Sequence, residues 1–294
     1  MADPRRIIPG ATYMLTRRAY QRTFRMRPHP LTNQIALYCL AVAAAKVGML
    51  IHAIVLMSNH LHLVATDPTG RLPDFLRDFH RSMAKALNAS QGQWENLWSA
   101  EHPSQVLLPT LDDVVAKVAY TVANPVAAGL VEDPAQWPGI LLWNPGTVVV
   151  NRPNVYFDPK GSAPEAATLN ICPIPGVDIG EWIRRVTHAV QDKVASAREQ
   201  VREQGLRFLG AAAVMAKSFL QKAQSYEAKR GMNPILAARD VSVRNTMKRL
   251  LREFRRAYAQ ALAAWRAGDR GVAFPFGTWW MRVHHAARVV PAMT

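Results

Sequence analysis

Residues 49–66 contain two short apolar stretches that are separated only by a Ser-Asn dipeptide at positions 58 and 59. This spacing predicts a hairpin of two neighbouring strands. Because side chains alternate between the two faces of a strand, His60 and His62 lie on one face and the leucines beside them on the other. Two imidazoles on one face are a pair of potential metal ligands, although an isolated pair is more often simply polar surface.

The patterns around this hairpin occur in the order strand, helix, strand, strand, helix, strand, helix. This order predicts an α+β fold with a ferredoxin-like antiparallel sheet and one extra helix, in which both histidines lie on a central strand. The third helix should end near Asn124, because Pro125 disfavours helical geometry at the residue before it. The expected elements span residues 13–16, 31–47, 49–57, 60–66, 72–89, 105–108 and 110–124.

The chain is strongly basic, with 36 Lys and Arg against 21 Asp and Glu and a net charge of +15 over 294 residues. The excess is uneven: residues 1–168 carry 15 − 12 = +3, and residues 169–294 carry 21 − 9 = +12. Such a surplus indicates a polyanionic partner, for which nucleic acid is the first candidate. Two cysteines are too few for a disulfide framework.

Three segments follow from composition and pattern. The middle one is rich in Pro, Gly and Asn without a sustained period, and we interpret it as a linker with one short strand at 148–150. No apolar run is long enough to span a bilayer and no signal peptide is evident, so a cytoplasmic protein without membrane contact is expected. The predicted segments are a first domain at 1–138, the linker at 139–175 and a mainly helical, basic DNA-binding domain at 176–294.

A candidate site combines the histidines with the third helix. Tyr120 and Asn124 are four residues apart and therefore share one helix face, which can pack beside the sheet close to His60 and His62. A phenol with a pKa near ~10 is a poor nucleophile at neutral pH. A divalent metal held by the imidazoles, Mg²⁺ or Mn²⁺, could polarise a phosphodiester for attack by such a phenol.

Three motifs in this region resemble one family. The segment 57–64, Met-Ser-Asn-His-Leu-His-Leu-Val, resembles the HUH motif of single-tyrosine transposases, in particular the REP-associated tyrosine transposases. The segment 120–131, which begins Tyr-Thr-Val-Ala-Asn-Pro-Val, resembles the segment that carries the nucleophile in that family, and 93–98 resembles its Gly-x-Leu-Trp stretch. The resemblance covers about residues 13–137.

The resemblance implies that His60 and His62 bind a divalent metal, that Tyr120 is the nucleophile and that Asn124 takes the place of a third, polar ligand. It further implies a transposase that cuts and joins single-stranded DNA beside a hairpin or palindrome through a 5′-phosphotyrosine intermediate. The active protein would be a monomer or a homodimer.

Two departures from the family pattern remove cationic groups. Ala127 stands where the family usually has Arg, and the Arg-Tyr-Lys that commonly follows the Leu-Trp is absent. An alternative is therefore a domesticated DNA-binding protein that keeps the fold and has little activity.

Seven basic residues are candidates for contacts with DNA phosphates, which would be independent of sequence and sensitive to salt. One group lies in a basic loop after the first strand, and the other on a helix predicted at 240–268. Either group could instead be an ordinary solvated face. The candidates are Arg17, Arg18, Arg22, Arg244, Lys248, Arg252 and Arg255.

Overall fold

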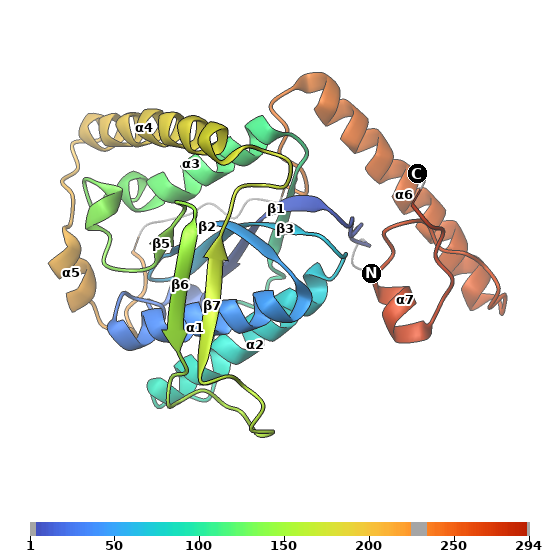
Figure 1. The fold of residues 1–294 in the computed structure, drawn as a ribbon, viewed down its shortest axis with the longest axis horizontal. Coiled ribbons are helices and arrows are strands. Elements are labelled where there is room, and N and C mark those ends of the chain that lie inside the picture. The colour runs from blue at the N-terminus through green and yellow to red at the C-terminus, as the bar shows by residue number, and fades with distance from the viewer. Residues whose placement is uncertain (1–3, 225–233, 293–294) are drawn as a thin grey trace.

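The computed structural model describes residues 4–224 and 234–292 (Figure 1). Its centre is a seven-stranded sheet. Six strands follow the order β4-β1-β3-β2-β7-β6, and the seventh, β5, pairs with β2. The strands are β1 (Ala11–Arg18), β2 (Leu50–Leu56), β3 (His60–Asp67), β4 (Ser104–Leu108), β5 (Leu141–Leu142), β6 (Gly146–Asn151) and β7 (Ala166–Ile171).

The first four strands are antiparallel to their neighbours in the order β4-β1-β3-β2, which is the ferredoxin-like arrangement. Helix α1 (Pro30–Val47) connects β1 to β2, and helix α2 (Leu72–Ser90) connects β3 to β4. The predicted α+β fold is therefore confirmed, and both histidines lie on a strand with a neighbour on each side.

Helices cover both faces of the sheet (Figure 1). Leu61 and Leu63 of β3 join the apolar core formed with α1 and α2. Val64 points the other way, into a second core with helices α3 (Leu111–Ala127) and α4 (Ile179–Glu203). The alternation along β3 thus places His60 and His62 on the α3 side.

The segment 139–175 is not the linker that its composition predicts. Strands β6 and β7 form a hairpin, β7 runs parallel to β2 through Ile51 and Ile171, and the amide of Cys172 donates to the carbonyl of Ile51 at 2.9 Å. Leu169 and Ile171 are buried in the core beside α1. The linker prediction failed because this pairing joins segments far apart in sequence, which local composition does not reveal.

Helix α4 also departs from the predicted segments, which place it in a separate domain from residue 176. Trp182 is 1% exposed, and together with Val186 it packs among the valines of α3. Without α4, this second core would be exposed on its outer side. The structural unit around the sheet therefore extends through α4.

The remaining elements are helical. A separate apolar cluster is formed by Ala261, Phe274, Met281 and Ala287, and the amide of Ile7 donates to the carbonyl of Gly277 at 2.9 Å. No helix within the described part of the chain is both long and apolar enough to cross a membrane. These helices are α5 (Ala211–Ala216), α6 (Val241–Arg266) and α7 (Trp280–His285), and the short 3-10 helices are η1 (Tyr20–Arg22) and η2 (Pro134–Gln136).

Candidate active site

His60 and His62 stand next to each other on the α3 side of the sheet. Their ring centroids are 4.8 Å apart and their planes are inclined by 78°. The register of β3 with β1 places Thr16 opposite His62 and Arg18 opposite His60. The hairpin predicted from the sequence therefore presents both imidazoles together.

Hydrogen bonds orient both rings through Nδ1. Asn59 Oδ1 lies 2.7 Å from His60 Nδ1, while Asn59 Nδ2 donates to the carbonyl of Arg22 at 3.4 Å. The amide oxygen of Asn59 can only accept, so this contact suits the tautomer of His60 with the proton on Nδ1 and the lone pair on Nε2. His62 Nδ1 lies 2.8 Å from Thr16 Oγ1, an arrangement that suits the same tautomer. A hydrogen bond at Nδ1 is typical of histidines that bind a metal through Nε2.

His62 is held in its neutral form. Only 6% of the residue is exposed, and burial lowers its pKa well below the ordinary value, with further contributions from His60, Arg18 and Lys117. A neutral imidazole is the form that binds a metal ion.

Helix α3 brings Tyr120 to this pair. The helix begins after Thr110, whose Oγ1 accepts a hydrogen bond from the amide of Asp113 at 3.2 Å. The ring of Tyr120 lies 5.4 Å from that of His62 at an angle of 76°, and the residue is 38% exposed. A large substrate can therefore reach the phenol of Tyr120 from solvent, while the other side of the Tyr120 ring faces His62.

Asn124 lies within α3, on the face that carries Tyr120, and is partly buried. The prediction that the helix ends near this residue was wrong, because α3 continues to Ala127 with Pro125 in its last turn. A proline so close to the end removes little of the helical hydrogen bonding, and the carbonyl of Pro125 accepts from the amide of Leu130 at 3.0 Å. The i, i+4 spacing of Tyr120 and Asn124 is thereby kept.

Two imidazoles are the potential metal ligands that the structure brings together at this site. Among residues 4–224 and 234–292, no three His, Cys, Asp or Glu side chains are grouped so that they could hold a metal ion. The orientation of His60 and His62 fits a cation bound through Nε2, and Asn124 is the amide on the neighbouring helix face. Oxygen ligands beside imidazoles suit Mg²⁺ and Mn²⁺.

Lys117 is a residue of this site that the sequence analysis missed. Its Nζ lies 5.4 Å from the centre of the Tyr120 ring, one turn earlier on the same helix face. Burial and the nearby cations Lys193 and Arg239 lower its pKa. Its position three residues before Tyr120 was a signal that could have identified it.

The three arginines of the first predicted DNA-binding group have different surroundings. Arg17 donates from its guanidinium to the carbonyls of Glu101 and Ser99, so it holds the loop that follows α2. Arg18 is exposed beside His60, and Arg22 lies in η1 close to Asn59.

The second predicted group lies on α6, which leads away from the sheet (Figure 1). Lys248 and Arg252 are exposed, whereas Arg244 and Arg255 are partly buried, and Arg244 donates to the carbonyl of Ala238 at 3.3 Å. These four residues thus lie on a helix outside the layers that enclose the sheet.

His52, which the sequence places on the neighbouring strand, is a packing residue. Its Nδ1 lies 2.7 Å from the carbonyl oxygen of Cys172 and its Nε2 lies 2.7 Å from Thr66 Oγ1. Both nitrogens are therefore occupied within the core.

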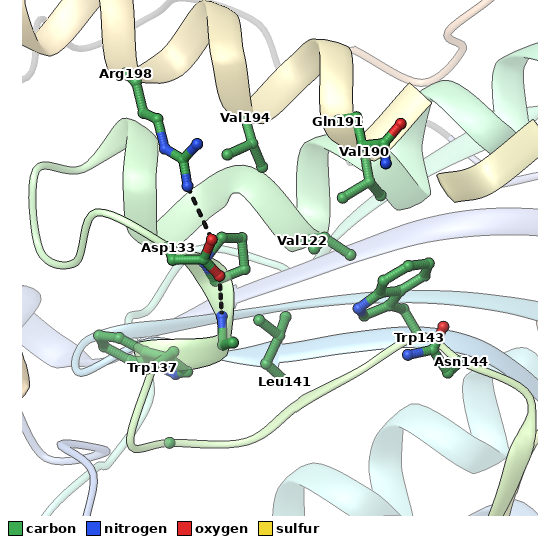
Figure 2. A pocket seen from close by; sticks show the side chains of 13 residues that line it. Val122, Asp133, Trp137, Leu141, Trp143, Asn144, Val190, Gln191, Val194 and Arg198 are labelled. Carbon is green, nitrogen blue, oxygen red and sulfur yellow. Dashed lines mark hydrogen bonds and ion pairs between the residues drawn. The ribbon is translucent and has the colours of Figure 1, made fainter. Parts of the chain in front are cut away.

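A pocket of about 520 Å³ lies between α3, α4 and the segment around β5. Figure 2 shows the ion pair of Arg198 with Asp133 at one end and Trp143 at the other. Val122 lines the pocket, and at about 100° per residue its side chain lies roughly 200° around the helix from Tyr120. The pocket and the histidine–tyrosine group thus occupy opposite flanks of α3.

Comparison with known proteins gives similarities to solved structures. No protein-family description and no curated protein sequence matches the chain. A REP-associated tyrosine transposase bound to a REP hairpin has 21% identity over 47% of this chain and 81% of its own, with a TM-score of 0.40. A protein of Deinococcus radiodurans R1 assigned as a transposase has 17% identity over 42% of this chain and 97% of its own, with a TM-score of 0.28.

Proposed function

We propose that the protein cuts and rejoins single-stranded DNA, at or beside a hairpin, in the manner of a single-tyrosine transposase. The observation that carries this proposal is the meeting of three rings, those of His60, His62 and Tyr120, from the hairpin and from α3. Each of these residues also stands at its place in a motif that resembles the family. The net charge of +15 over the whole chain is compatible with such a polyanionic substrate.

His60 and His62 would hold a divalent cation, with Asn124 as the third protein ligand. A cation bound there would polarise the scissile phosphodiester and neutralise the negative charge that develops on it. The hydrogen bonds from Asn59 and Thr16 would keep both imidazoles in the required tautomer.

Tyr120 is the nucleophile in this proposal. Its phenol oxygen attacks phosphorus and loses its proton, the new bond joins tyrosine to the 5′-phosphate, and the bond from phosphorus to the 3′-oxygen breaks. The departing 3′-oxygen takes up a proton to become a hydroxyl. Because one phosphoester replaces another, a 3′-hydroxyl can reverse the step without an energy source.

The test uses a hairpin oligonucleotide with a single-stranded flank and a label at its 3′ end, since the labelled fragment stays attached to the protein. The wild-type protein with Mn²⁺ or Mg²⁺ should give a covalent adduct on a denaturing gel, and a chelator should prevent it. Tyr120→Phe should give none, whereas Tyr20→Phe, at another exposed tyrosine, should behave as the wild type.

Two results would overturn the mechanism. One is a Tyr120→Phe variant that cuts as well as the wild type. The other is a wild-type protein that binds the hairpin with either cation present and forms no adduct, which would favour the alternative of a domesticated DNA-binding protein.

A further inference from the structure

The face of α3 that carries Tyr120 presents a row of functional groups. Asp113, Lys117, Tyr120 and Asn124 follow one another at intervals of three or four residues, so they line one flank of the helix over about 16 Å. Lys117 contacts the Tyr120 ring from this row. The flank is therefore a surface along which a strand could approach the phenol.

Arg239 is fixed at the start of this row. Its backbone amide donates to Asp113 Oδ1 at 2.8 Å, and Asp113 is only 3% exposed. The Arg239 residue itself is exposed. The segment before α6 thus places the charged residue Arg239 beside this flank of α3.

Lys193 reaches the same flank from α4. Helix α4 runs parallel to α3, because Arg185 pairs with Asp112 at the start of α3 and Arg198 pairs with Asp133 beyond its end. Lys193 follows Arg185 by eight residues, as Tyr120 follows Asp112, so both lie about 12 Å along their helices. Lys193 therefore stands at the level of Tyr120.

None of the three cations Lys117, Lys193 and Arg239 is in an ion pair within residues 4–224 and 234–292, although Asp113 lies near enough to Lys117 to raise its pKa slightly. By contrast, Arg185 and Arg198, which lie on α4 with Lys193, are both paired with acids. Lys193 and Arg239 are close enough to Lys117 to lower its pKa, after the larger effect of burial. Asp113 acts in the opposite direction with the smallest effect on this pKa, so a net repulsion between the cations remains that a bound anion would relieve.

We propose that Lys117, Lys193 and Arg239 bind successive backbone phosphates of the single DNA strand whose scissile phosphate lies at Tyr120. This inference rests on the proposed function and names the path of the substrate. These three residues would also replace the cationic groups that the family pattern has, and this chain lacks, at Ala127 and after Trp98.

The test measures affinity for a fluorescent single-stranded oligonucleotide as a function of salt. All variants carry Tyr120→Phe, so that no strand is cut. Replacement of Lys117, Lys193 and Arg239 together by Met should reduce the slope of log affinity against log salt by about 2, at ~0.7 per phosphate contact. The affinity should fall at least about tenfold at moderate salt.

The matched control is the triple replacement of Lys46, Arg77 and Arg202 by Met. These cations are paired with acids, and their loss changes the net charge equally. The slope should stay within error of that of the parent protein. Equal effects of both triple variants would overturn the proposal, because they would reflect net charge alone.

Lys193→Met and Lys193→Arg give a test that does not depend on folding, since Lys193 is exposed. Only the first should reduce the slope. The covalent-adduct assay separates the two proposals. A wild-type protein that forms no adduct would overturn the cutting mechanism. If the triple variant at Lys117, Lys193 and Arg239 still shows the reduced salt slope, the phosphate path is supported.

Discussion

Thr16 Oγ1 lies 2.8 Å from His62 Nδ1, between neighbouring strands and directly opposite in register. Thr16→Val keeps the shape of the side chain and removes this hydrogen bond. We expect the concentration of Mn²⁺ that supports half-maximal adduct formation to rise about 10–100-fold, because His62 loses the hydrogen bond that orients its ring. Titration of the adduct assay with Mn²⁺ measures this.

Thr12→Val is the control for this change, since Thr12 lies on the same strand and bonds to Thr66 instead of a candidate ligand. It should leave the metal requirement unchanged. The same rise in both variants would mean that damage to β1, and not the orientation of His62, is responsible.

Asn59 has a separate role, because its amide joins the carbonyl of Arg22 to His60. Asn59→Ala should lower the rate of adduct formation about 10–100-fold at fixed metal concentration. Asn59→Asp keeps an acceptor for His60 Nδ1 and should retain most of the rate. Single-turnover kinetics compare the two variants, and an equal loss in both would contradict the proposed orientation of His60.

His52 should make the stability depend on pH. Burial lowers its pKa from 6.5 to about 4, so between these pH values His52 binds a proton in the unfolded chain but not in the folded chain. The contribution to stability is therefore complete above pH 6.5 and decreases as the pH falls towards 4, by at most ~3 kcal/mol. Urea unfolding between pH 7 and 4.5 should show this decrease, and it should be smaller in His52→Gln. A variant with the full decrease would show that other groups, such as the buried His80, account for it.

Helix α4 should be essential to the sheet unit. Trp182→Ala removes a side chain that is 1% exposed and should lower the free energy of unfolding by about 3–5 kcal/mol. The neighbouring Ile183 is 43% exposed, so Ile183→Ala should change it by less than about 0.5 kcal/mol. Denaturant titration of both variants decides whether α4 belongs to the core of the sheet unit.

The basic face of α6 remains a prediction from the sequence. Lys248 and Arg252 are exposed, and their joint replacement by Met should reduce the salt slope for single-stranded DNA by about 1.4 if both contact phosphates. Adduct formation at saturating DNA should not change, because α6 does not contribute to the His60–Tyr120 group. An unchanged slope would identify these residues as a solvated face.

Much of the site was predictable because its geometry follows from local periods. The alternation along β3 fixed the common side of His60 and His62, and the helical period fixed the common face of Tyr120 and Asn124. Both periods depend only on backbone geometry within one element. The end of α3 was predicted wrongly, because the restriction imposed by Pro125 is weak in a last helical turn.

The sequence by itself determined the ferredoxin-like order of elements, the hairpin that carries the histidines and the basic character of the chain. Only the tertiary structure decided that β6 and β7 extend the sheet, that α4 closes the core over α3, and that Lys193 and Arg239 approach Lys117. Those features depend on pairing and packing between distant segments, which are selected by the burial of whole faces and leave no period in the local sequence.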